Sequence, residues 1–238
     1  MICFLTSRMD DAGNLNPANG FIQELRKRFP AKCRALYVCS APDGFEKTDL
    51  YASLIKDMME RAGFSFESYI ALDSRNEQQA AELVQNSNLL ILAGGHVPTQ
   101  NAFFCKIGLK NLLQNHSGVL IGISAGSMNS ADIVYAQPEE EGEAVDPAYQ
   151  RFLPGLSLTK TMFLPHYQDI RNDVLDGLRV FEDIAYPDSM GRTFYAIPDG
   201  SYLLIEDGCE TLRGTAYRIQ NGEFEQISGE GDKVLLIK

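Results

Sequence analysis

A serine flanked by glycines is the feature of this sequence best suited to covalent chemistry. The segment Gly122-Ile123-Ser124-Ala125-Gly126 follows an apolar run and precedes a stretch compatible with a helix. It fits the G-x-S-x-G pattern, in which a tight strand-to-helix turn exposes a nucleophilic serine and small neighbours let the backbone pass closely. The start of a helix also favours negative charge that develops nearby. The pattern predicts a nucleophile at Ser124; the alternative is a closely packed turn without a catalytic role.

A serine nucleophile needs a base, and the chain contains three histidines. His116 precedes the serine segment and is expected in a surface loop, and His96 follows Gly94-Gly95. His166 lies in the segment FLPHY (163–167), where an apolar run ends at a proline. Functional side chains commonly follow the ends of strands in such sheets. We therefore predict that His166 is the base.

The carboxylate that would orient this histidine is less sharply defined. Asp199, in the segment AIPDG (196–200), again ends an apolar run and is our choice. Asp169 and Asp132 are competitors, and an ordinary Asp-Gly turn is the alternative interpretation of Asp199.

An oxyanion hole needs backbone N–H donors that face the reacting carbonyl. The amide of Ala125, directly after the nucleophile, is one candidate. The glycine pair Gly94-Gly95 follows a neighbouring apolar run and is expected to supply the other, because glycine tolerates the backbone geometry that turns an amide inward.

The elements that must position these residues alternate between strand and helix. Strands are expected at residues 1–6, 34–40, 64–72, 88–93 and 117–123, and helices at 20–29, 48–62, 75–86 and 99–115. The helix at 48–62 is expected to begin at Thr48 as N-cap and to end before Gly63. Apolar strands alternating with helices predict a mainly parallel sheet covered on both faces.

The last part of the chain has a different pattern. Short strands are expected at 201–206, 215–219 and 224–227, with a hairpin turn at Asn221-Gly222. We expect these strands to form an antiparallel extension of the same domain, and one domain over residues 1–238.

Composition narrows the class of protein. The 238 residues carry a formal net charge of −11 without a basic run, which disfavours binding to nucleic acid or to an anionic membrane surface. No apolar run approaches the roughly 20 residues needed to cross a bilayer. The five cysteines form no CxxC pair, so a reducing compartment, the cytoplasm, is expected. The histidines lack metal-ligand spacing and no nucleotide-binding glycine motif occurs, so neither a metal nor an organic cofactor is expected.

Taken together, these segments resemble the peptidase E (aspartyl dipeptidase) family and its relative cyanophycinase. The matching pieces are LLILAGGH (89–96), GVLIGISAGSMNSAD (118–132), LPGLSLTKTMFLPHY (153–167) and AIPDGSYLLIEDG (196–208). They follow the family's order of serine, histidine and acid. This chain has Asp199 where well-known members have glutamate, and His96 where a smaller polar residue is usual.

The resemblance implies a three-layer, flavodoxin-like (class I glutamine amidotransferase-like) fold and a homodimer. It implies a triad of Ser124, His166 and Asp199, with Gly95 and Ala125 as the oxyanion hole, acting on a short peptide. For an arginine that would bind an N-terminal aspartate, the candidates are Arg171, Arg179 and Arg192. Position 124 holds a serine and not a cysteine, which argues against glutamine hydrolysis by a thiolate. The alternatives are an esterase or amidase with the same triad, and a binding protein without turnover.

Overall fold

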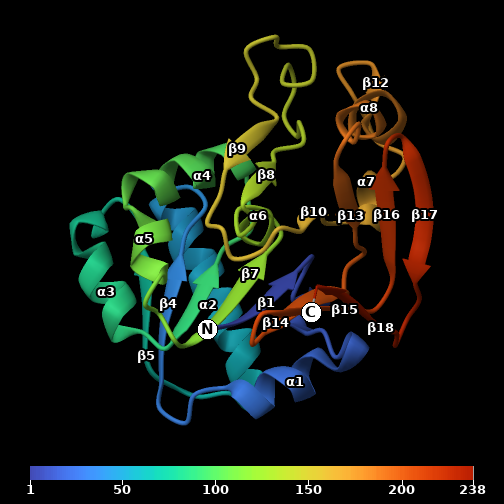
Figure 1. Cartoon of the computed structure of the whole chain (residues 1–238). Helices are drawn as coiled ribbons and strands as arrows, with labels where there is room; N and C mark the ends of the chain where they lie inside the picture. Colours follow the sequence, from blue (N-terminus) through green and yellow to red (C-terminus); the bar gives the residue numbers. More distant parts are fainter. Residues whose placement is uncertain (238) are drawn as a thin grey trace.

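The structure is a computed structural model that describes residues 1–237, and an eight-stranded sheet lies at its centre (Figure 1). One part of the sheet is parallel and contains, in spatial order, β1 (Ile2–Thr6), β7 (Val119–Ile123), β6 (Leu89–Leu92), β4 (Cys33–Val38) and β5 (Phe66–Leu72). The other part continues antiparallel from β1 through β14 (Tyr202–Glu206), β15 (Cys209–Arg213) and β18 (Lys233–Ile237). The mainly parallel sheet with a C-terminal antiparallel extension is confirmed.

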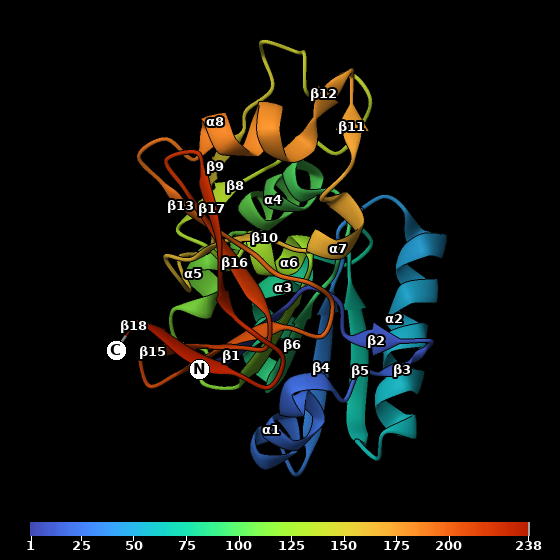
Figure 2. The ribbon, with the colours of Figure 1, turned by 90° about the vertical axis from the view of Figure 1, so that its right-hand side faces the viewer.

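Helices cover both faces of the parallel part, which is why its strands are nearly continuous apolar runs. On one face lie α1 (Phe21–Arg28) and α2 (Phe45–Arg61), and on the other α3 (Ala80–Asn86), α4 (Val97–Lys106) and α5 (Leu109–Leu113) (Figures 1 and 2). All four residues of β6 are completely buried.

The helices differ from the sequence-based expectation at two places. Helix α2 begins at Phe45, so Thr48 is not its N-cap; Thr48 is buried in the first turn, and its hydroxyl donates to the Ala41 carbonyl at 3.4 Å. The single helix expected at 99–115 is two helices, because the chain turns at Gly108, which has a φ of 66°. The expected end of α2 before Gly63, whose φ is 86°, is confirmed.

A second, four-stranded sheet contains β10 (Met162–Leu164), β13 (Thr193–Ala196), β16 (Ala216–Gln220) and β17 (Glu223–Ser228). Strands β10 and β13 are parallel, and the others are antiparallel. Asn221 and Gly222 join β16 to β17 with φ values of 53° and 78°, the left-handed pair that a tight hairpin requires. The predicted hairpin is confirmed.

Short elements complete the chain. They are the hairpin β2 (Asp10–Asp11) and β3 (Asn14–Leu15), α6 (Ala125–Met128), β8 (Ile133–Tyr135), β9 (Phe152–Pro154), α7 (Tyr167–Ile170), β11 (Val174–Leu175), β12 (Leu178–Arg179), α8 (Tyr186–Asp188), the 3₁₀ turns Ala18–Gly20 and Glu77–Gln79, and the π-helical segment Val180–Ala185. Within residues 1–237, no helix is both long and apolar enough to cross a membrane.

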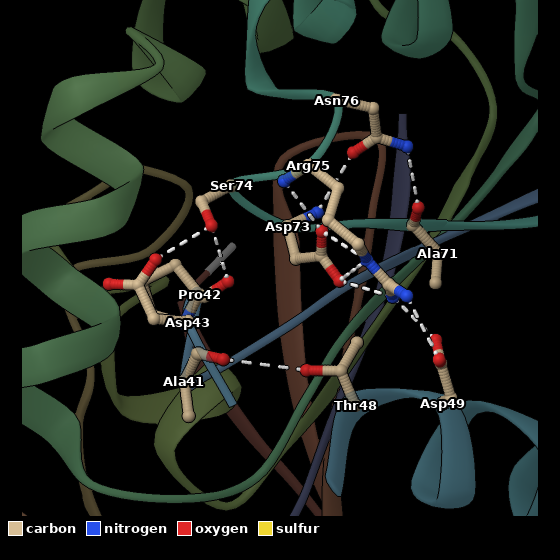
Figure 3. Close-up of polar contacts among 10 residues, drawn as sticks. All are labelled: Ala41, Pro42, Asp43, Thr48, Asp49, Ala71, Asp73, Ser74, Arg75 and Asn76. Atoms are coloured by element: carbon tan, nitrogen blue, oxygen red, sulfur yellow. Dashed lines mark hydrogen bonds and ion pairs between the residues drawn. The ribbon is translucent and has the colours of Figure 1, made fainter. Parts of the chain in front are cut away.

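A polar network fixes the start of α2 to the loop that follows β5 (Figure 3). The carboxylate of Asp73 is 1% exposed and accepts hydrogen bonds from Arg75, which also pairs with Asp49 of α2 at 2.5 Å. The hydroxyl of Ser74 donates to the Pro42 carbonyl at 2.9 Å, in the loop between β4 and α2. Because a buried charge is stable only when it is paired, this network holds the first turns of α2 in place.

Candidate active site

Ser124 lies directly after β7, at the carboxyl edge of the parallel sheet. Its φ of 47° and ψ of −110° lie outside the regions that non-glycine residues ordinarily occupy. Its amide donates to the carbonyl oxygens of Thr6 and Ser7, both at 3.0 Å, so the end of the neighbouring strand β1 holds the strained turn. Strain of this kind is typical of functional turns.

Gly122 and Gly126, which flank Ser124 where β7 is followed by α6, are required by close packing. A Cβ atom on Gly122 would lie 2.9 Å from the amide nitrogen of Ser127, and one on Gly126 would overlap the carbonyl oxygen of Leu92 in β6. The spacing of glycines around Ser124 therefore follows from the approach of α6 to the sheet.

His166 and Asp199 come from paired strands of the smaller sheet. Strands β10 and β13 are parallel, with Leu164 opposite Ala196, so the residues that follow them emerge at the same edge. His166 adopts a left-handed conformation with φ 58° at the start of α7. Its ring contacts Ser124, which follows a strand of the larger sheet, and Asp199, which follows a strand of the smaller sheet.

The three side chains form one hydrogen-bonded row. The Nε2 atom of His166 lies 2.9 Å from Ser124 Oγ, and its Nδ1 atom lies 2.9 Å from Asp199 Oδ1. The competing carboxylates are engaged elsewhere: Asp169 accepts a bond from Gln168, and Asp132 accepts one from Ser157. Asp199 is thus the carboxylate that contacts the imidazole.

Opposing effects act on the Asp199 carboxyl group. Burial disfavours its charged form, but the hydrogen bonds from His166 and Ser7 outweigh burial and, with the charge of Arg8 at 3.5 Å, hold the pKa of Asp199 below its usual value. Asp199 is therefore ionised at neutral pH and can stabilise a positive charge on the ring of His166.

Ser7 is a site residue that sequence reasoning missed. Its side chain is fully buried, accepts the backbone N–H of His166 at 2.8 Å and donates to Asp199 Oδ1 at 2.6 Å. Strands β1 and β7 are in register, with Thr6 opposite Ile123, so Ser7 and Ser124 occupy the same level of the sheet edge. The signal in the sequence was a polar residue directly after the first parallel strand.

Two backbone amides near Ser124 remain free. Within residues 1–237, neither the Ala125 amide nor the Gly95 amide donates a hydrogen bond to a protein acceptor. Gly95 has a φ of 147° and follows β6, and it shares the wall of two cavities with Ser124.

The sequence profile of peptidase family S51 matches residues 2–212. The chain belongs to peptidase family S51. This S51 peptidase is therefore a hydrolase of the serine peptidase class, and a peptide is the class of substrate that the family implies. No curated protein matches the sequence.

Solved structures support the fold of this S51 peptidase. A peptidase from an acI-B1 Actinobacterium aligns with a TM-score of 0.67 at 16% sequence identity, over 99% of this chain and 96% of that one. A putative peptidase E protein from Listeria monocytogenes EGD-e aligns with a TM-score of 0.59 at 14% identity, over 95% of this chain and 98% of that one.

The other two histidines of the S51 peptidase lie outside the row. His96 hydrogen-bonds Glu143 at 2.8 Å and thereby attaches the loop after β8 to the start of α4. His116 is not the surface residue expected: it is half-buried, its Nε2 atom is enclosed without a hydrogen-bond partner in the described chain, and burial lowers its pKa.

The three candidate arginines line neither cavity beside Ser124. Arg179 pairs with Asp183 at 2.7 Å, Arg171 lies over the ring of Tyr167, and Arg192 lies over a phenylalanine ring. The cationic residues that do line a cavity at Ser124 are Arg8, Lys47 and Arg61, none of which the sequence pattern singled out.

Among residues 1–237, two groups of side chains have donor atoms close enough together for a metal ion. One contains His166, Asp169 and Asp199, and the other His96, Glu140 and Glu143. In the first, both ring nitrogens of His166 already have partners in Ser124 and Asp199. In the second, His96 uses both ring nitrogens for hydrogen bonds to Thr99 and Glu143. The donor sets are thus arranged for hydrogen bonding.

Proposed function

We propose that this S51 peptidase hydrolyses short peptides through an acyl-enzyme on Ser124, with His166 as base and Asp199 as the residue that orients it. The observation that carries the proposal is the row of 2.9 Å contacts from Ser124 through His166 to Asp199. Such a row transfers the serine proton while the carboxylate stabilises the resulting imidazolium.

The steps follow from these positions. Ser124 Oγ attacks the peptide carbonyl as its proton passes to His166 Nε2, and the free amides of Gly95 and Ala125 donate hydrogen bonds to the negatively charged carbonyl oxygen. The C–N bond then breaks as His166 protonates the leaving amine. Water, deprotonated by His166, attacks the acyl-enzyme, and the proton returns to Ser124 as the acid product leaves.

Site residues contributed by both sheets support treating residues 1–238 as one catalytic domain. Ser7, Ser124, His166 and Asp199 follow four different strands of two sheets. Arg171, Arg179 and Arg192 do not support aspartyl specificity, because none of them lines a cavity beside Ser124. The homodimer and the cytoplasmic location expected from the sequence stay predictions, which gel filtration and fractionation of cells would test.

Labelling with a fluorophosphonate tests the nucleophile directly. We expect the wild type to be labelled at Ser124, the Ser124→Ala variant to lose the label, and the Ser117→Ala variant, which lacks an exposed serine of the connection before β7, to keep it. A label that persists on Ser124→Ala contradicts the proposal. A panel of dipeptides and simple esters then separates a peptidase from an esterase.

A further inference from the structure

Two cavities meet at the proposed nucleophile. One has a volume of about 360 Å³ and the other about 430 Å³, and both are lined by Gly95, Ser124 and His166. Each exceeds the roughly 300 Å³ at which ligand pockets begin. A peptide whose carbonyl lies at Ser124 has one such space for each of its ends.

The smaller cavity is acidic and contains an unsatisfied amide. Among the described residues, Glu139 contributes the carboxylate of this cavity, and its apolar wall includes Leu164 and Ile170. Gln137 also lines it; this residue is 5% exposed, and its Oε1 atom has no hydrogen-bond partner among residues 1–237. Since a buried amide is stable only with partners, the wall of this cavity is built to receive a polar group.

The larger cavity has the opposite charge. Arg8, Lys47 and Arg61 line it against the single carboxylate of Asp10. Arg8 is paired with Asp199, but in the described chain neither Lys47 nor Arg61 forms an ion pair. This is a local excess of cations in a chain whose net charge is −11, and it favours an anionic group in the cavity.

Helix α2 also supplies the apolar wall of this larger cavity. Tyr51 and Leu54 are 48% and 51% exposed, and they lie on the same face of the helix as Lys47, with Ile55 and Met58. The network of Asp73, Arg75 and Asp49 holds the turn that carries Lys47 (Figure 3). Lys47 therefore lies on a helix that this network holds in place, beside an apolar surface.

Resting on the proposed function, we infer that the two cavities are oppositely charged subsites that orient a short peptide with two free ends. The N-terminal ammonium group lies toward Glu139 and Gln137, and the residue with the free carboxylate lies toward Lys47, with its apolar side chain on α2. The acyl part then occupies the smaller cavity, and the leaving amino acid occupies the larger one. The inferred substrates are dipeptides with a neutral, apolar N-terminal residue and a large apolar C-terminal residue.

The arrangement disfavours an N-terminal aspartate. Its side-chain carboxylate would enter the smaller cavity beside Glu139, and Glu140 and Glu143 lie near that residue. Like charges at close range oppose binding, so Asp-Leu is expected to bind more weakly than Leu-Leu.

Binding to the full-length Ser124→Ala variant tests the subsites without turnover. Calorimetry would compare Leu-Leu, Leu-Leu amide, N-acetyl-Leu-Leu and Asp-Leu. We expect Leu-Leu to bind about fivefold more tightly than each of the other three, the ratio that one partly exposed charge pair supports. Adding Lys47→Met should weaken the binding of Leu-Leu about fivefold and leave the binding of its amide unchanged. Adding Glu139→Gln should weaken the binding of Leu-Leu about fivefold and leave the binding of N-acetyl-Leu-Leu unchanged.

Matched controls are Lys56→Met on the same helix and Glu141→Gln in the same loop, which line neither cavity and should leave both ratios unchanged. Equal affinity for Leu-Leu and its two blocked derivatives overturns the inference, as does a preference for Asp-Leu that Lys47→Met removes. If the ratios hold but the wild type cuts none of the four peptides, the proposed function fails and the subsites stand. If the wild type cuts them without regard to their ends, the subsites fail and the proposed function stands.

Discussion

The hydroxyl group of Ser7 donates a hydrogen bond to Asp199 Oδ1 at 2.6 Å, on the same oxygen that His166 Nδ1 contacts at 2.9 Å. Ser7 also accepts the backbone N–H of His166. One buried hydroxyl thus fixes both the backbone of the histidine and the carboxylate that faces its ring. We expect its role to be the positioning of these two residues.

Replacing Ser7 by alanine should lower kcat about tenfold and change KM less than about twofold, because the buried N–H of His166 loses its acceptor and the carboxylate loses a donor. Ser189→Ala is the matched control: Ser189 is equally buried, donates to the Tyr186 carbonyl and accepts the Gly222 N–H, far from Ser124. Both variants should lose similar stability in thermal unfolding. Equal kcat values in the two variants would show that Ser7 has a structural role alone.

The Ser124→Ala variant should lose peptide hydrolysis by about 10⁴-fold or more, as expected for the serine of a triad. The fold should survive, since the change removes one oxygen atom and does not alter the bonds that hold the backbone at φ 47° and ψ −110°. Circular dichroism and initial rates on a dipeptide measure both effects. Retained turnover would exclude Ser124 as the nucleophile.

Asp199→Asn should keep the fold and lower kcat by about 10²–10⁴-fold, because an amide cannot stabilise the imidazolium of His166. Asp199→Glu should also be slower than the wild type, since the longer side chain overreaches the positions now set by the 2.6 Å and 2.9 Å contacts. Asp169→Asn is the control and should change kcat little. A larger loss in the Asp169 variant would reassign the acid.

Glu139 should make substrate affinity depend on pH. Glu139 is an exposed residue, but the protein around it disfavours the charged form of its carboxyl group, and the carboxylates of Glu143 and Glu140 add repulsion; together these effects raise the pKa of Glu139 to about 7. Above this pH the group is charged and attracts the peptide ammonium, and below it the attraction is lost.

The KM for Leu-Leu should therefore rise as pH falls from about 7.5 to about 6, a range in which the α-amino group is largely protonated. In Glu139→Gln the rise in KM should disappear. Steady-state rates of both proteins across this range measure the difference. A KM that varies equally in both proteins would rule out Glu139 as the group that titrates.

Gly126→Ala should destabilise the fold by at least about 1–3 kcal/mol, because the added methyl group meets the backbone of Leu92 in β6 and neither can move without disturbing the sheet. Gly229→Ala is the control, since its nearest neighbour would lie at 3.4 Å, an ordinary contact. Chemical denaturation measures the difference. Equal stability of the two variants would show that the turn around Ser124 can accommodate the added methyl group.

The sequence by itself determined the features that depend on neighbouring residues. The glycines around Ser124 reflect steric demands within one turn, and the alternation of apolar runs with helical segments reflects burial of the strands on both faces. The pair Asn221-Gly222 defined a hairpin because few residues adopt its backbone geometry. His166 and Asp199 could be chosen because each follows an apolar run, and the structure brings both within hydrogen-bond distance of one another.

Tertiary structure decided what depends on the register and packing of distant segments. Ser7 reaches Asp199 only because β1 pairs with β7 in a register that sets Thr6 opposite Ile123, and no local pattern encodes that pairing. Asp199 prevails over Asp169 because the parallel pairing of β10 and β13 aims its side chain at the ring of His166. Lys47 and Glu139 belong to a helix and a loop that meet Ser124 only in the folded chain, where each lines one of the cavities beside it. Such contacts join residues that are far apart in sequence, so hydrophobic periodicity and turn preferences, which act over a few residues, do not specify them.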